Sequence, residues 1–438
     1  MGEYFMNMKF RYVLLGMAFI FFNCSSDDLG TTIEEPTEEL PEVELKAREN
    51  IVLTEAGKAI NTQVQGFSFE LMNILAKERG NNVNYCYSPL GISLVMGMAL
   101  NGADKDTYEQ IQKTLGFEGY SSQDINEYML ALQTALPEID NTSTFINANS
   151  LWGKRDKLFL SDYVSQSQKY YFAALKDNLP FDETTMDEIN AWSKEQTNGM
   201  IPEFVESVNE IKGAEAILLD ALYFKGTWQS VFEKSKTEDK EFILADGTKK
   251  SVPMMQKANE IMQCVSNDEV IIVRLPYGNG AFNMYAFLPA DSNQSIDKLW
   301  QGLTAEKWNQ WLNRGLVGYK TTLSIPRFAT KTNDSELVSI LKAMGIQEAF
   351  SSSADFSRMS LLDLYISWVK QITMIEVEEE GTVAAAVSGL GMEMTSNGAG
   401  VVETPTLKVD FNRPFGFILS EFSTGTVLFA GKVGNPAL

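Results

Sequence analysis

The sequence predicts an α+β fold in a single domain that runs from residue 61 to residue 438. Helical patterns dominate up to Pro202, whereas strand patterns dominate after Ala214. Helices followed by strands favour an α+β arrangement with a mixed or antiparallel sheet. No internal repeat and no hinge-like linker occurs after residue 61, so we expect one domain.

The first half of this domain is predicted to be mostly helical. From Asn61, apolar residues recur at the spacing of one helix face, as at Val64, Phe67 and Leu71. A second apolar helix is predicted for Pro89–Asn101, because proline is favoured in a first helical turn. A strand at residues 144–154 is the one predicted interruption.

The second half is predicted to be mostly strands. The apolar and alternating runs are Ala216–Lys225, Lys240–Leu244, Lys250–Met255, Val270–Pro276, Phe282–Leu288, Thr321–Phe328, Gly416–Glu421 and Val427–Val433. One helix, Ser335–Met344, is expected among them and ends at Gly345, since glycine is a common helix terminator.

The composition excludes several classes of function. There is no histidine in 438 residues, so Ser-His-Asp and Cys-His nucleophiles are excluded, and neither a metal nor another cofactor is expected. The net charge of −22 argues against nucleic acid and heparin-like polyanions as partners. Three cysteines are too few for a disulfide framework, and Cys86 and Cys264 are predicted to be buried free thiols.

Residues 1–23 have the pattern of a secretory signal peptide. Lys9 and Arg11 precede the apolar run Tyr12–Phe22, which is too short to span a membrane. Cys24 follows and resembles the lipid acceptor of bacterial lipoproteins, and Ser25–Asp28 resembles the acidic signal that sends such lipoproteins to the cell surface. We therefore expect a lipid anchor on Cys24 at the extracellular face of a bacterial outer membrane, with plain secretion as the alternative.

Residues 24–60 are predicted to be an acidic tether between this anchor and the domain. Asp27–Asn50 holds nine acidic residues, two basic residues, two prolines and no aromatic residue. Such a segment buries too little apolar surface to order itself.

The stretch Glu376–Val409 is predicted to carry the function. A long stretch without a helix of its own is usually functional in a compact domain, although an ordinary flexible hairpin tip is the alternative. Side chains alternate along an extended chain, so one face of this stretch would be small and then apolar. The members of that face are Thr382, Ala384, Ala386, Ser388, Leu390, Met392 and Met394.

Eight short motifs are spread in order over residues 61–436. They are Tyr87–Leu90, Asp220–Trp228, Val252–Met255, Leu275–Tyr277, Ile325–Phe328, Ala354–Ser357, Ile375–Thr382 and Phe411–Phe415. Each resembles a motif of the serpin family, and eight in the same order argue strongly against chance.

The resemblance implies a metastable fold of three β-sheets and about eight or nine helices, with an exposed reactive-centre loop. It also implies a suicide-substrate inhibitor of serine proteases, and by extension of cysteine proteases, rather than an enzyme. In this mechanism the protease cleaves the loop, which inserts into the main sheet as a new strand and traps the acyl-enzyme.

The family pattern places the hinge of the loop at Glu379, Gly381, Thr382, Val383, Ala384, Ala385 and Ala386. Glycine allows the bend that starts insertion, and small side chains fit into a closing sheet. These residues therefore favour an inhibitor over a carrier protein of the same fold.

The scissile bond falls between Thr395 and Ser396 when it is counted from Glu379, with Met394 as the alternative bait residue. The segment after Ser396 is longer than is common in the family, so cleavage further along stays open. Elastase-like or chymotrypsin-like proteases are favoured over trypsin-like ones, because no Lys or Arg lies between Gly381 and Glu403.

The resemblance also places a polar cluster under the main sheet, where the family has Ser, Ser, Asn and His. The matching residues here are Ser88, Gly91, Asp220 and Gln371. Trp228 resembles a tryptophan at the top of the opening sheet, and an ordinary core residue is the alternative for it. We hypothesise that the Gln371 amide donates a hydrogen bond to Asp220, because a buried carboxylate without a partner would be costly. Divergence without any such pairing is the alternative.

Two rival functions remain at this stage. One is a non-inhibitory binding or carrier protein of the same fold, and the other is a surface glycan-binding protein or carboxylate-type hydrolase, which the absence of histidine does not exclude. A monomer is expected, and its acidic balance would steer basic target proteases towards it.

Overall fold

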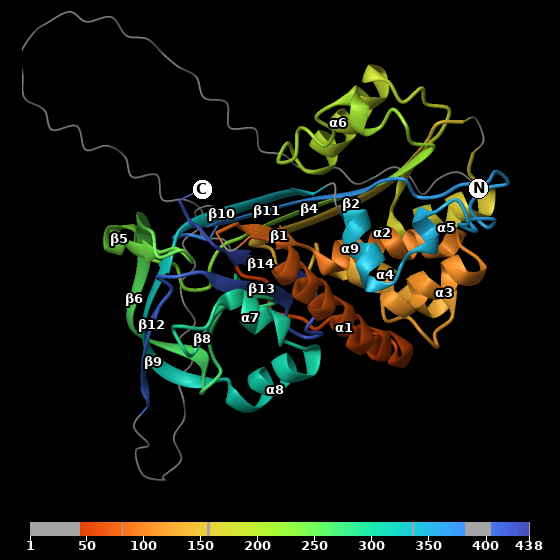
Figure 1. Ribbon diagram of the computed structural model, residues 1–438. Helices are drawn as coiled ribbons and strands as arrows, with labels where there is room; N and C mark the ends of the chain where they lie inside the picture. Colours follow the sequence, from red (N-terminus) through yellow and green to blue (C-terminus); the bar gives the residue numbers. More distant parts are fainter. Residues whose placement is uncertain (1–43, 81, 156–157, 335–336, 382–403, 438) are drawn as a thin grey trace, which may run out of the picture. The chain divides into compact units, whose positions relative to one another are not determined.

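The described strands form two hydrogen-bonded sheets, with helices packed on them (Figure 1). The computed structural model describes residues 44–80, 82–155, 158–334, 337–381 and 404–437. Within these ranges the helices are α1 (Glu55–Glu78), α2 (Pro89–Gly102), α3 (Lys105–Thr114), α4 (Ser122–Ala135), α5 (Ser161–Tyr171), α6 (Glu183–Gln196), α7 (Ile296–Gln301), α8 (Ala305–Gly315) and α9 (Leu337–Met344).

The smaller sheet has the strand order β10-β11-β4-β2-β3, and the larger follows β1-β14-β13-β8-β7-β6-β9-β12 with β5 paired to β6. The strands are β1 (Tyr85–Tyr87), β2 (Ser143–Gly153), β3 (Ala174–Lys176), β4 (Ala216–Gly226), β5 (Glu238–Ile243), β6 (Lys249–Ser266), β7 (Val270–Pro276), β8 (Phe282–Pro289), β9 (Val317–Pro326), β10 (Phe328–Asp334), β11 (Val369–Val377), β12 (Thr406–Asp410), β13 (Phe415–Glu421) and β14 (Val427–Val433).

The predicted α+β class and the predicted number of helices agree with the described part of the chain. The described strands connect into two sheets rather than three, because the 18-residue β6 pairs with β5 in its first part and with β7 at its end. A register shift in the pairing of β6 with β9, between Lys257 and Glu260, marks the bend, and Asn259 there takes a positive φ of 59°. The single strand predicted for residues 321–328 is two strands, β9 and β10, which meet at Arg327.

The folded part of the chain begins earlier than the predicted boundary at residue 61. Helix α1 starts at Glu55, and the Thr54 side chain caps it by accepting a 3.0 Å hydrogen bond from the Gly57 N–H. Ahead of the helix, Ile51 and Leu53 are buried, and the Ile51 N–H donates to Ser423 Oγ at 3.0 Å. A tether that ends at residue 60 is therefore too long, since residues 51–60 pack on the domain.

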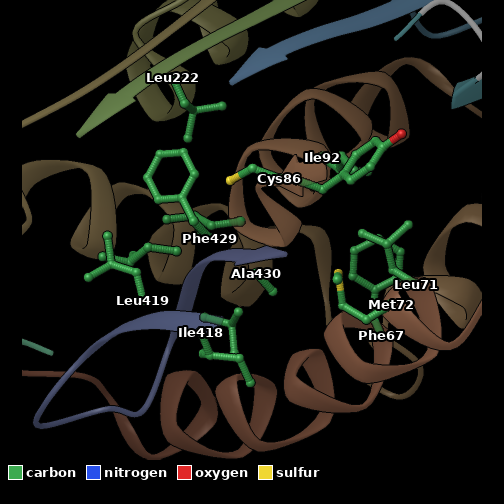
Figure 2. Packing of buried hydrophobic residues seen from close by; sticks show 14 of the residues in the cluster. Phe67, Leu71, Met72, Cys86, Ile92, Leu222, Ile418, Leu419, Phe429 and Ala430 are labelled. Carbon is green, nitrogen blue, oxygen red and sulfur yellow. The ribbon is translucent and has the colours of Figure 1, made fainter. Parts of the chain in front are cut away.

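The main core lies between α1, α2 and the two sheets. Figure 2 shows Phe67, Leu71 and Met72 of α1 facing side chains of β13 and β14, with Leu222 of β4 close by. The helix and the strands each have one apolar face. Packing these faces together removes both of them from water, which stabilises the fold.

Strand β4 is buried on both faces, which explains its continuous apolar sequence. Leu218 and Leu222 point into the main core, whereas Ile217 and Leu219 belong to a second core with Trp192 of α6. In Figure 1, α6 lies on one side of the smaller sheet, and α2 and α9 lie on the other. The side chains of β4 that alternate with Ile217 and Leu219, including Asp220, therefore face the α2 side.

Candidate functional site

The centre of the site is the junction between β4 and β11 in the smaller sheet. The two strands are parallel, and their register pairs Val369 with Leu218 through to Met374 with Tyr223. Every other strand pair of this sheet except β2–β3 is antiparallel. Parallel strand pairs are slightly less stable per residue than antiparallel pairs, so the pairing of β4 with β11 should be easier to separate than the antiparallel pairs of this sheet.

Two of the predicted residues face each other across this junction. Gln371 of β11 is in register with Asp220 of β4, and its Nε2 donates to Asp220 Oδ2 at 2.7 Å. The same amide donates to Ser88 O at 3.0 Å, and its oxygen accepts from the Ser88 N–H at 2.8 Å. The hydrogen bond predicted from Gln371 to Asp220 is therefore present, and the two strands are tied to Ser88, the N-cap of α2.

Asn147 of β2 completes this group, which we call the Asp220 cluster (Ser88, Asn147, Asp220 and Gln371). Its Nδ2 donates to Asp220 Oδ1 at 2.8 Å, so each carboxylate oxygen has an amide donor. Sequence reasoning missed Asn147. Its position in a run of alternating polar residues, opposite Leu222 in register, gave no sign that it reaches the carboxylate of Asp220.

Gly91 contributes to the Asp220 cluster by its lack of a side chain. A Cβ at this position would overlap the Asp220 carboxylate and Leu222. The family pattern has a serine where this chain has Gly91, and the space of that side chain is taken by the carboxylate. The carboxylate of Asp220 therefore fits at this position only because residue 91 is a glycine.

Burial raises the pKa of Asp220 to about 7, although the hydrogen bonds from Gln371 and Asn147 lower it in part. The residue is 1% exposed, and its contacting partners are neutral amides. A carboxyl at the strand junction therefore changes its charge in the neutral pH range, which in most proteins is a property of histidine.

At its end, β11 leads into a tight turn that we call the hinge turn (Glu378–Gly381). The Gly381 N–H donates to Glu378 O at 3.1 Å, and Gly381 has a φ of +92°, in the region that favours glycine. A Cβ there would also overlap the backbone at Gly226 and Thr227, next to the end of β4. The bend predicted at Gly381 is present.

Trp228 holds this turn beside the end of β4. Its indole N–H donates to Glu378 O at 2.8 Å, and its backbone N–H donates to Glu380 O at 3.1 Å. The ring is 1% exposed and stacks on Tyr277, with 4.1 Å between the ring centroids. Trp228 thus joins the end of β4 to the hinge turn, and its predicted place at the opening end of the sheet stays a prediction.

The Glu379 side chain is clamped inside the protein. Its carboxylate is 1% exposed and accepts hydrogen bonds from Arg327 Nε at 2.7 Å and from Thr237 Oγ1. Burial acts to raise the pKa of Glu379, but Arg327 and Thr237 outweigh it and hold the pKa below its ordinary value. The sequence identifies Arg327 only as part of a motif, because its partner Glu379 lies 52 residues away.

Several predicted residues lie outside the described part of the chain. They are Thr382, Val383, Ala384, Ala385 and Ala386 of the hinge, the scissile-bond candidates Met394, Thr395 and Ser396, and the lipid acceptor Cys24. The structure therefore describes the foot of the loop, up to Gly381, and its return at β12.

Within the described ranges, no group of three or more His, Cys, Asp or Glu side chains is placed so that it could hold a metal ion. Cys86 and Cys264 are buried free thiols, as predicted, and burial raises the pKa of Cys264 to about 11.

None of the described helices has the length and the apolar character to cross a membrane.

Known proteins resemble this chain over most of its length. A leukocyte elastase inhibitor A from Mus musculus is 33% identical over 380 residues, covering 84% of this chain and 97% of that protein. A leukocyte elastase inhibitor from Bos taurus is 33% identical over 362 residues, covering 81% of this chain and 93% of that protein. The solved structure of tengpin, a thermophilic serpin in the native state, matches with a TM-score of 0.75 and 28% identity, over 90% of this chain and 97% of that one.

The family model described as "Serpin (serine protease inhibitor)" matches residues 62–436. This range holds the strand junction, the Asp220 cluster and the hinge turn. The family is described by the inhibition of proteases and not by an enzyme activity, and the fold has the predicted α+β architecture. The chain belongs to the serpin family.

Proposed function

We propose that the protein is a suicide-substrate inhibitor of serine proteases, and that its loop enters the sheet between β4 and β11 once a protease has cut it. The observation that carries the proposal is the strand junction itself. Strand β11 leads directly into the hinge turn, which lies beside the end of β4. A segment that turned back after Gly381 would run antiparallel to both strands.

Such an insertion would lower the free energy of the protein for two reasons. It would replace one parallel ladder by two antiparallel ones, which are more stable per residue. About ten new backbone hydrogen bonds, at roughly 1 kcal/mol each, would be joined by burial of Leu390, Met392 and Met394, at roughly 1.5–3 kcal/mol each.

The residues around the junction would then resist insertion until the loop is cut. Opening the sheet requires that Gln371 and Asp220 separate, because they face each other across β4 and β11. It also requires that the hinge turn leave Trp228, which donates two hydrogen bonds to it. Both sets of contacts would therefore stabilise the state in which the loop has not entered the sheet.

Two observations support elastase-like or chymotrypsin-like proteases as targets. Relatives at 33% identity are named as leukocyte elastase inhibitors. The loop itself offers Met394 and Thr395, and it has no Lys or Arg between Gly381 and Glu403. Cysteine proteases also form an acyl-enzyme, so they belong to the same proposal.

The experiment is to mix the intact protein with pancreatic elastase, chymotrypsin, trypsin and subtilisin. We expect an SDS-stable adduct with at least one of the first two, and mass spectrometry should place the new end at Met394, Thr395 or a neighbour. Cleavage in the loop without an adduct would contradict inhibition and would favour the carrier protein of the same fold.

We also propose that Cys24 carries a lipid that anchors the protein at the bacterial cell surface. The support is the apolar run before Cys24 and the acidic residues after it. Metabolic labelling with a fatty acid should mark the wild type and leave Cys24→Ala unlabelled. Equal labelling of both proteins would exclude Cys24 as the acceptor.

A further inference from the structure

A cavity of about 400 Å³ lies against Trp228, and no residue of the Asp220 cluster lines it. Its walls come from β6, β7 and the segment after Trp228, and the residues used below are Arg48, Trp228, Lys257, Ile261, Arg274 and Phe422. We call it the Trp228 cavity.

One part of the cavity is apolar and open to solvent. Leu275 and Met262 are buried in its wall, whereas Ile261 and Phe422 are 65% and 40% exposed. Exposed large apolar side chains around a cavity often mark a binding site for a molecule with an apolar body.

The other part of the cavity carries positive charge that the protein leaves unbalanced. The guanidinium groups of Arg48 and Arg274 lie 4.0 Å and 4.8 Å from the centre of the Phe422 ring. Arg274 donates to the neutral side chains of Asn283, at 2.7 Å, and Gln263. Neither arginine forms an ion pair with a carboxylate in the described ranges. Burial lowers the pKa of Arg274, and the nearby charge of Arg48 adds to this.

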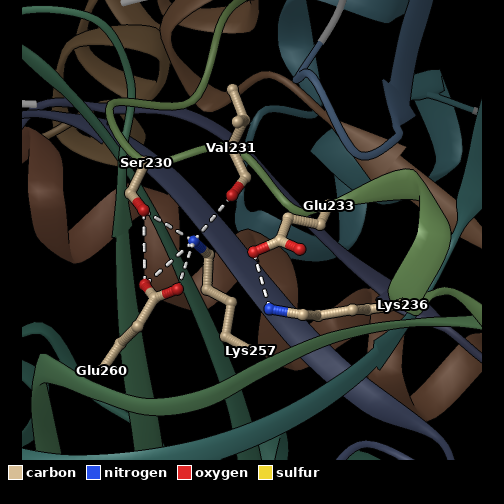
Figure 3. A network of polar contacts seen from close by, with 6 residues as sticks. All are labelled: Ser230, Val231, Glu233, Lys236, Lys257 and Glu260. Carbon is tan, nitrogen blue, oxygen red and sulfur yellow. Dashed lines mark hydrogen bonds and ion pairs between the residues drawn. The ribbon is translucent and has the colours of Figure 1, made fainter. Parts of the chain in front are cut away.

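Lys257 supplies a third cation, but its charge is already compensated (Figure 3). Its ammonium group donates to Ser230 Oγ at 2.7 Å, to Val231 O at 2.9 Å and to Glu260 Oε2 at 3.0 Å. The bulge in β6 brings Lys257 and Glu260 to this position. With three cations and one carboxylate, the lining has a formal charge of +2 in a chain of net charge −22.

We propose that the Trp228 cavity binds an amphipathic organic anion, which places its apolar body against the exposed Ile261 and Phe422, next to the buried Trp228, and its carboxylate, sulfonate or sulfate group on Arg48 and Arg274. The charge of the lining, the exposed apolar rim and the two arginines without carboxylate partners all fit this class of ligand. A neutral apolar molecule would leave the arginines uncompensated, and an inorganic anion would leave the apolar rim exposed.

The position of the cavity gives the bound anion a consequence. Trp228, Gln229 and Ser230 line it, and Trp228 also donates the two hydrogen bonds that hold the hinge turn. A ligand that prefers this arrangement stabilises it relative to any state in which the turn has left Trp228. The binding site stands without the proposed function, whereas an effect on inhibition rests on it.

Binding is tested with the intact protein and the fluorescent anion 8-anilinonaphthalene-1-sulfonate. We expect saturable one-to-one binding under conditions where circular dichroism shows a folded protein. N-phenyl-1-naphthylamine, which has the same rings without the sulfonate, should bind at least tenfold more weakly. Equal affinity for the two probes would overturn the proposal.

Three variants locate the site. Arg274→Gln, Arg48→Gln and Ile261→Glu should each weaken binding of the anion at least tenfold, and Arg48 and Ile261 are exposed enough to change without unfolding the protein. Arg314→Gln, on the exposed side of α8, and Leu361→Glu, at a side chain that is 87% exposed, are matched controls outside the cavity. Unchanged binding in the first three variants, or equal loss in the controls, would overturn the proposal.

The link to the hinge turn is measured by hydrogen exchange, which needs no protease. Saturation with the anion should slow exchange of the Trp228 amide at least threefold. No slowing there would refute the link while leaving the binding site in place. Failure to form any protease adduct would refute the proposed function without affecting either result.

Discussion

Gln371 of β11 donates a 2.7 Å hydrogen bond to Asp220 of β4, directly across the junction that loop insertion would have to open. By the family resemblance, the pair stands where serpins have Asn and His. It does so in a chain without histidine, and it brings a carboxyl with a strongly raised pKa into the centre of the sheet.

Gln371→Ala is expected to lower the thermal midpoint of the protein by several degrees. It removes one donor to the buried Asp220 carboxylate and leaves the buried Ser88 N–H without its acceptor, at a cost of about 1–3 kcal/mol for each unsatisfied group. The measurement is thermal unfolding followed by circular dichroism, together with the rate of loss of inhibitory activity at 37 °C. If stability and inhibition are both unchanged, the pair has no role.

Asp220→Asn is expected to flatten the pH dependence of stability. The pKa of Asp220 is about 7 in the folded protein and about 3.9 in an unfolded chain. Between these values the folded state binds more protons, so the contribution of this carboxyl is fully present below pH 4 and is lost as the pH rises through 7.

The difference amounts to at most about 4 kcal/mol. Thermal midpoints measured at several pH values from 5 to 8 should therefore fall more steeply for the wild type than for Asp220→Asn. Parallel curves for the two proteins would show that Asp220 does not titrate in this range.

Gly91→Ala is expected to destabilise the protein, because the new Cβ would overlap the Asp220 carboxylate and Leu222. The matched control is Gly66→Ala on α1, where a Cβ has no heavy atom within 4 Å. There the change should raise stability slightly, by about 0.4–1 kcal/mol, since alanine has the better helix propensity. A lower thermal midpoint than the wild type for Gly91→Ala, with a slightly higher one for Gly66→Ala, would confirm the packing at Gly91. A Gly91→Ala protein as stable as the wild type would contradict it.

Arg327→Ala is expected to destabilise the folded protein by about 1–3 kcal/mol, because the 1% exposed Glu379 carboxylate loses its cation, whereas the Arg327 side chain itself is 40% exposed. Lys408→Ala is the control, since Lys408 and Asp410 form an exposed pair at 3.5 Å that should contribute little. Urea unfolding midpoints measure both changes. Equal, small shifts would mean that the Glu379 clamp contributes no more than a surface ion pair.

Thr382→Arg is expected to convert the protein from an inhibitor into a substrate. In the proposed mechanism residue 382 enters the sheet first, and a charge buried there without a partner would stop insertion. The gel assay should show cleavage of the loop with loss of the SDS-stable adduct, whereas Thr382→Ser should keep the adduct. An adduct that survives in Thr382→Arg would rule out insertion through this residue.

Much of the site could be predicted from the sequence because its residues belong to local motifs. Gly381 follows an acidic strand, and Ser88 stands directly before a helix-starting proline, so both roles follow from neighbours in the chain. Asn147 and Arg327 could not be found in this way. Their importance comes from partners 73 and 52 residues away, at distances that only the sheet register sets.

The start of the domain was misplaced for a related reason. Residues 51–60 follow an acidic stretch and look like the end of a tether, yet Ile51 and Leu53 are buried and the Ile51 N–H bonds to Ser423, 372 residues away. Apolar residues at the edge of a polar segment are ordered only when a distant surface receives them.

The α+β class, the family resemblance, the change from helices to strands along the chain and the exclusion of histidine-based catalysis all follow from the amino-acid sequence, because they depend on composition, periodicity and the order of motifs. Which polar groups meet follows only from the folded chain. The tertiary structure placed Gln371 opposite Asp220, put Gly91 beneath that carboxylate and gathered Arg48, Arg274 and Phe422 around one cavity. Contacts of this kind join residues far apart in the chain, and their geometry follows from packing and register rather than from local preference.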